Sequence, residues 1–280
     1  MLNRDVEALS VQERSDVLLD LLKVNRMVTS GQLERWGLAE AAGRLGLPSR
    51  LQSVRTQVTQ PSSLRNLRFV GTDERLLRRP ERELKHWAAL SEVWWTMWLG
   101  KHGVWEVLDG RGREGRRMPD ARVSGLWWEP WAIEIDCGYD KPQIQRKLLG
   151  IAEAGYRRVV WATTVHDRVR RVGWLIDDLW RDGKLTGLEE YEIRFCNFWI
   201  SQDPYQNRPR CYKRNDFFGQ RQVILELAYG DVGEDDGGWQ EEDEVSEDDL
   251  QDGHAWEGED AYEDKRVWQD HEDWSDGELE

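Results

Sequence analysis

The stretch PDARVSGLWWEPWAIEIDCGYDKPQIQRKLLGIAEAGYRRVVWA, residues 119–162, sets the expectation for the fold. Residues 121–126 and 131–137 are rich in apolar and β-branched side chains, which predicts two strands. Residues 144–154 repeat apolar positions at helical spacing, and 158–162 form a short apolar run typical of a buried strand. An order of strand, strand, helix and strand indicates a mixed sheet covered by helices.

The segments around this stretch extend the same pattern. Residues 81–99 carry apolar side chains at spacings of three and four, which predicts a long amphipathic helix. Further elements are expected on both sides, namely strands at 104–108, 191–200 and 222–228 and a helix at 169–180. We therefore expect an α/β (α+β) domain over residues 79–230, with helices on both faces of a mixed sheet.

Three acidic residues lie on or immediately before the strands of the opening stretch. Pro119-Asp120 precedes one expected strand, and Glu134 and Asp136 lie on the next. Side chains alternate between the faces of a strand, so Glu134 and Asp136 point to the same side. With Asp120 on the neighbouring strand, three carboxylates converge, the oxygen-rich set that Mg²⁺ or Mn²⁺ prefers in phosphodiester hydrolysis. Asp120 and Glu134 are the predicted metal ligands.

A lysine is the usual companion of such carboxylates, because it can hold a phosphate or help to activate water. Lys147 on the expected helix is the first candidate, and Lys141 is the alternative. The predicted catalytic set is therefore Asp120, Glu134, Asp136 and Lys147. The competing interpretation is an inactive fold, in which Glu134 and Asp136 pair with Arg146 or Lys147.

Residues 1–78 are expected to form a winged helix-turn-helix. Four helices are predicted. The first covers residues 11–24, the second begins after an N-cap at Thr29 or Ser30, and the others cover 38–45 and 50–60. Residues 64–70 then alternate apolar and basic side chains, as in a basic hairpin.

The last of these helices and the hairpin carry the predicted DNA contacts. We expect Arg50, Arg55 and Gln57 to enter a major groove of double-stranded DNA, and Arg65 and Arg68 to contact phosphates. The alternative is a small helical domain whose solvated basic face contacts protein.

Two resemblances rest on these motifs. Residues 117–148 resemble the core motif of the PD-(D/E)-x-K nuclease superfamily, in its divergent form with the lysine on the helix. Over residues 12–165 the chain resembles the bacterial replication-relaxation family of plasmid- and mobile-element-associated proteins. The matching segments are 18–36, 86–94, Pro119-Asp120-Ala121, Glu134-Ile135-Asp136, Arg146-Lys147-Leu148 and 158–162.

These resemblances imply a restriction-endonuclease-like sheet and a role in plasmid replication or DNA relaxation. They leave nuclease activity undecided, because Asp136 occupies the position of the motif's usual lysine. An active protein would need Mg or Mn, whereas an inactive one would need no cofactor. The alternatives are therefore a replication or relaxation factor that cleaves DNA and a non-enzymatic transcription or copy-number regulator; a homodimer is compatible with both.

Charge divides the chain unevenly. Residues 231–280 hold 23 Asp or Glu against two basic residues, a net charge of −21, whereas residues 1–230 carry +6. So acidic a segment with few aliphatic residues predicts a disordered tail. Its tryptophans, Trp239, Trp256, Trp268 and Trp274, suggest a protein partner, and the alternative is a solubilising role.

The cysteine spacing and the hydropathy of the chain indicate its cellular compartment. Three widely spaced cysteines form no Cys-x-x-Cys pair, and no run approaches a membrane span. We expect a cytoplasmic protein without a disulfide framework.

Overall fold

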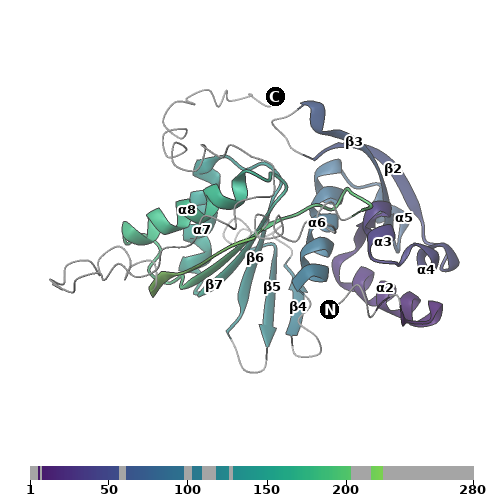
Figure 1. Ribbon diagram of the computed structural model, residues 1–280, viewed down its shortest axis with the longest axis horizontal. Coiled ribbons are helices and arrows are strands. Elements are labelled where there is room, and N and C mark those ends of the chain that lie inside the picture. The colour runs from purple at the N-terminus through teal and green to yellow at the C-terminus, as the bar shows by residue number, and fades with distance from the viewer. Residues whose placement is uncertain are drawn as a thin grey trace, which may run out of the picture. The chain divides into compact units, whose positions relative to one another are not determined.

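A six-stranded mixed sheet follows the N-terminal elements (Figure 1). The computed structural model describes residues 6, 8–56, 61–97, 103–108, 118–125, 129–202 and 216–222. The strands lie in chain order, with the bounds β4 Gly103–Val107, β5 Ala121–Gly125, β6 Trp131–Asp136, β7 Arg158–Thr163, β8 Glu190–Phe195 and β9 Asp216–Gln220. β6, β7 and β8 are parallel to one another, and the remaining neighbours pair antiparallel. The mixed sheet is thus confirmed.

Helices cover both faces of this sheet (Figure 1). On one face α6 (Glu81–Met97) packs against Ile133 and Ile135 of β6. On the other, α7 (Lys141–Glu153) and α8 (Arg168–Arg181) pack against Ala132 and Trp161. Successive side chains of a strand point to opposite faces, so one apolar strand serves two hydrophobic clusters.

The N-terminal part begins with short, well-capped helices. α2 (Val11–Asn25) starts with a capping box of Ser10 and Glu13, and α3 (Ser30–Arg35) with one of Thr29 and Gln32. Each box satisfies backbone N–H groups that a helix end leaves unpaired. α4 (Ala39–Arg44) follows, so the first three predicted helices are confirmed.

The predicted helix at 50–60 is wrong. Its first part is a strand, β2 (Ser49–Arg55), and residues 57–60 lie outside the described ranges. In β2 only Val54 is buried, too little apolar surface to anchor a helix. As a strand, the segment pairs along its whole length with β3 (Leu64–Gly71). β3 also pairs with β1 (Met27–Thr29), giving a second sheet of order β1-β3-β2.

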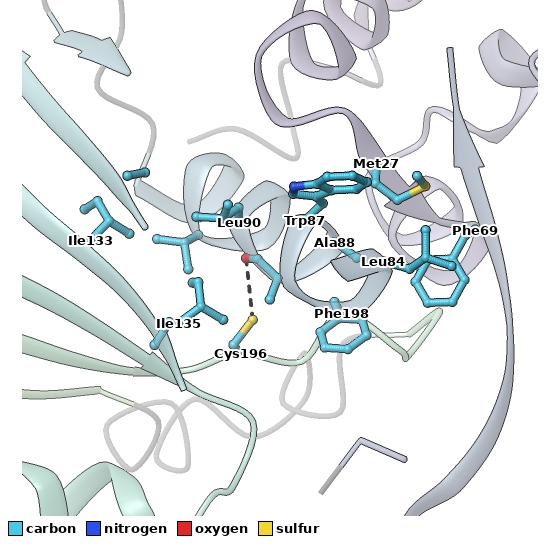
Figure 2. Close-up of a cluster of buried hydrophobic side chains, with 14 of the residues drawn as sticks. Met27, Phe69, Leu84, Trp87, Ala88, Leu90, Ile133, Ile135, Cys196 and Phe198 are labelled. Carbon is cyan, nitrogen blue, oxygen red and sulfur yellow. Dashed lines mark hydrogen bonds between the residues drawn. The ribbon is translucent and has the colours of Figure 1, made fainter. Parts of the chain in front are cut away.

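Helix α6 joins the two sheets through a shared core. Figure 2 shows Trp87 and Leu84 of α6 beside Met27 and Phe69, while Leu90 lies beside Ile133. The Cys196 thiol donates to the Ala89 carbonyl oxygen over 3.6 Å, the dashed line of Figure 2. Burial of these side chains stabilises the junction by removing apolar surface from water.

The remaining described elements are short. They are η1 (Pro61–Ser63) before β3 and α5 (Glu74–Leu77) after it. Most of the predicted strand at 222–228 and the whole acidic tail lie outside the described residues. None of the helices within the described ranges combines the length and the apolar character that a membrane span requires.

Candidate functional site

Asp120 and Glu134 lie side by side on adjacent strands. The pairing of Ala121 with Ile133 places Asp120 opposite Glu134. The Asp120 amide donates to the Ile133 carbonyl oxygen at 2.9 Å, and its Oδ2 accepts from the Ile135 amide at 2.8 Å. These two hydrogen bonds to the β6 backbone hold the Asp120 carboxylate beside Glu134, immediately before β5 begins.

Lys147 reaches this pair from helix α7. Its Nζ lies 2.8 Å from Glu134 Oε1, and the Tyr139 hydroxyl donates to the same oxygen at 3.3 Å. The Glu134 side chain is fully buried and that of Lys147 is 17% exposed. Of the two lysines considered from the sequence, Lys147 is the one that forms this ion pair. The structure therefore brings together Asp120, Glu134 and Lys147.

Burial dominates the electrostatics of the pair. It raises the pKa of Glu134 well above the ordinary value, and the nearby Asp120 charge raises it further, against the opposing effect of Lys147. Burial acts to lower the pKa of Lys147, but the charges of Glu134 and Asp120 outweigh it and raise that pKa. Glu134 Oε2 has no hydrogen-bond partner among the described residues. A proton or a cation at Glu134 would relieve this unpaired buried oxygen.

Asp136 has a different environment. Its Oδ1 accepts from the amides of Gly138 and Tyr139 at 2.7 and 2.6 Å, and lies 3.3 Å from Arg168 Nη1. The carboxylate thus closes the turn after β6 and pairs with α8. The described residues contain no group of three or more His, Cys, Asp or Glu that could hold a metal ion. The expected carboxylate cluster is therefore an Asp120–Glu134 pair.

A cleft of about 440 Å³ opens beside Asp120 and Tyr139. His86 of α6 lines it and places Nε2 3.5 Å from Asp120 Oδ1. The sequence motifs do not single out His86, Tyr139 or Arg168 as site residues. One available signal is the i, i+4 spacing of Arg82 and His86, which places both side chains on one side of the helix.

The predicted DNA contacts fall mainly on the β2–β3 hairpin. The register places Arg55 and Arg68 on one face of it, with Leu51 and Leu64 exposed beside them. That face is the outer one, because Val54, Leu67 and Phe69, on the opposite side, are buried. Residues 49–72 include four arginines and no acidic residue.

Arg50 and Arg65, which are also predicted to contact DNA, do not share this outer face. Arg65 lies opposite Val54 and donates to the Ser62 carbonyl oxygen at 3.2 Å. Arg50 donates to the Leu77 carbonyl oxygen at 2.8 Å. Gln57 lies outside the described residues.

Comparisons with known proteins identify no relative of this chain. A scan against protein-family models, a search of curated proteins and a search of solved structures each find no match for this chain. The two family resemblances therefore stay predictions from sequence motifs.

Proposed function

We propose that this chain is a double-stranded-DNA-binding protein, a replication or relaxation factor of a plasmid, phage or other mobile element. One observation carries DNA binding: Arg55 and Arg68 share the outer face of the β2–β3 hairpin, and residues 49–72 include no acidic residue. Arginine guanidinium groups bind the phosphate backbone of DNA. The assignment to mobile elements rests on the replication-relaxation resemblance alone.

The order of elements supports a winged helix-turn-helix as the DNA-binding unit. Three helices, α2, α3 and α4, precede the β2–β3 hairpin, and β1 completes its sheet. In this arrangement α3 and α4 would form the helix-turn-helix, and β2–β3 the wing. Arg55 and Arg68 would then reach phosphates from the outer face of the wing.

Salt dependence tests the hairpin assignment. Each phosphate contact contributes about 0.9 to the slope of log affinity against log salt, so Arg55→Ala with Arg68→Ala should lower its magnitude by about 2. The matched control is Arg75→Ala with Arg78→Ala, which removes the same charge from exposed positions at α5. Fluorescence anisotropy with a labelled duplex measures both. An unchanged slope in the hairpin variant would exclude this interface.

Metal-dependent phosphodiester cleavage is the second candidate function. The position of Asp120 beside Glu134 on adjacent strands favours it. The ion pair of Lys147 with Glu134 is expected in both the active and the inactive fold, so a cleavage assay has to decide between them. The donor set fits a divalent cation: Glu134 Oε2 lacks a partner among the described residues, and Mg²⁺ accepts two carboxylates with water completing its shell. A bound Mg²⁺ or Mn²⁺ would polarise the phosphate and lower the pKa of a water. Asp120 and Glu134 would hold it, and Lys147 would orient the phosphate.

Nicking of supercoiled plasmid with Mg²⁺ or Mn²⁺ tests this candidate. Asp120→Asn and Glu134→Gln should abolish nicking yet keep duplex affinity, because metal ligands act on the transition state. Glu106→Gln, at an exposed position on β4, is the control. Wild-type protein that nicks with neither metal would favour the alternative, a transcription or copy-number regulator with an inactive nuclease-like domain.

A further inference from the structure

The cleft beside Asp120 combines an apolar wall with two arginine side chains. Its volume of about 440 Å³ suits one small ligand and lies in the range of ligand pockets. The apolar wall consists of Trp87, Val107, Leu108 and Ile135. Arg26 and Arg82 also line the cleft. We propose that it binds a single nucleotide, with the phosphate on these two arginines and the base against the apolar wall.

Arg26 is held at the cleft in an unfavourable backbone conformation. It caps the C-terminus of α2 with φ 71°, the one non-glycine residue of the described ranges with positive φ. Glycine is the usual residue at such a position, since a side chain there costs about 1–2 kcal/mol. The guanidinium carbon lies 5.5 Å from the Trp87 ring centroid. A strained position that carries an arginine rather than glycine points to a use for the guanidinium group.

Arg82 supplies the second positive charge. It is exposed at the start of α6, one turn before His86, and forms no ion pair with any described residue. A single arginine guanidinium can bind both oxygens of a carboxylate. A phosphate has three acceptor oxygens, so one remains for a second arginine. Two arginines from separate elements therefore suit a phosphate better than a carboxylate.

The acidic side of the cleft fits the same ligand. Glu83, Asp120 and His86 also line it, and His86 Nε2 lies 3.5 Å from Asp120 Oδ1. A base or sugar offers N–H and O–H donors, which these acceptors can bind. The inference goes beyond the proposed duplex binding, because no cleft residue lies on the hairpin and the two activities are separable.

Isothermal titration of the full chain tests the cleft. Thymidine 5′-monophosphate should bind at least tenfold tighter than thymidine or inorganic phosphate, because only the nucleotide can contact the two arginines and the apolar wall together. Arg82→Ala should weaken binding at least tenfold, as expected for a lost charge-assisted hydrogen bond. Arg78→Ala, 76% exposed outside the cleft, is the control and should bind like wild type.

Arg26→Gly separates a ligand-binding role from a structural one. Glycine relieves the left-handed conformation, so the variant should keep or gain thermal stability while losing nucleotide affinity at least tenfold. Unchanged affinity in both Arg26→Gly and Arg82→Ala would overturn the proposal. Equal loss of affinity in Arg55→Ala/Arg68→Ala would also overturn it, because binding would then reflect overall charge.

The source of the nucleotide is resolved by short oligonucleotides. If a 5′-phosphorylated tetrathymidylate binds tenfold tighter than the free nucleotide, the cleft takes a strand end. If the free nucleotide binds as tightly, the ligand is a mononucleotide. If neither binds more tightly than its unphosphorylated counterpart, the proposal is refuted.

Discussion

Replacing Lys147 with methionine would leave the buried Glu134 carboxylate without its ion-pair partner. The two groups are 2.8 Å apart, with Glu134 fully buried and Lys147 17% exposed. Removing one member of such a pair costs about 3–5 kcal/mol when the other stays charged. At 2–4 °C per kcal/mol for a domain of this size, the melting temperature should fall by about 6–20 °C.

The penalty should depend on pH in a defined direction. Burial already holds the pKa of Glu134 well above its unfolded value, and loss of Lys147 raises it further. Between the unfolded and folded pKa values the folded state binds a proton that the unfolded chain has lost, so stability falls as pH rises. The penalty should therefore be smallest at low pH, where a protonated Glu134 needs no ion-pair partner, and should grow as pH rises and the wild-type pair becomes charged.

Thermal unfolding at pH 5 and pH 8, followed by circular dichroism, measures this difference. Glu134→Gln added to Lys147→Met removes the buried charge and should recover most of the loss at pH 8. The control is Arg122→Met, which breaks the exposed Arg122–Glu106 pair and should cost at most about 1 kcal/mol. An equal penalty at both pH values, or a double variant as unstable as the single one, would refute the reasoning.

Three further predictions concern other parts of the chain. Gly31→Ala should destabilise the protein by about 1–3 kcal/mol, because the added Cβ would lie 2.9 Å from the Ile200 carbonyl group. Gly43→Ala, which has nothing within 4 Å of its added Cβ, should stabilise helix α4 by about 0.5–1 kcal/mol. Equal shifts in melting temperature for the two variants would contradict this contrast. Asp136→Asn should lower the stability by about 3 kcal/mol, because Arg168 loses the charge of its ion-pair partner. Any plasmid nicking should remain below the melting temperature of the variant. Loss of nicking without loss of stability would instead make Asp136 a metal ligand. Deleting residues 231–280 should raise duplex affinity at low salt, because a segment of charge −21 competes with DNA for the basic residues, and equal affinity of truncated and full-length protein would exclude that competition.

Helices and central strands were predictable because their signals are local. The capping boxes at Ser10 and Thr29 each involve residues three apart, and the apolar periodicity of 81–99 and 144–154 repeats within single turns. Alternation along 131–136 predicted that Glu134 and Asp136 share a face, and the pairing of adjacent strands then places Asp120 beside Glu134. The sequence left Lys147 and Lys141 as alternatives, and the packing of α7 brings Lys147 to Glu134.

The segment 49–55 shows where local signals fail. It has polar residues suited to a helix surface and a preceding proline, and it was predicted helical. Its strand conformation comes from backbone pairing with 64–71, and its one buried side chain, Val54, packs in a core built from distant residues. Strand preference depends on such partners more than helix preference does.

The amino-acid sequence by itself determined the mixed α/β fold class, the basic and acidic division of the chain, and Asp120 and Glu134 as candidate site residues with two candidate lysines. Only the tertiary structure decided that Asp136 pairs with Arg168, that His86 meets Asp120, and that Arg26 and Arg82 share a cleft. These contacts join elements far apart in the chain, so they depend on how α2, α6 and α8 pack against the strands. Local periodicity specifies which face of each element is apolar, but not which distant side chain that face meets.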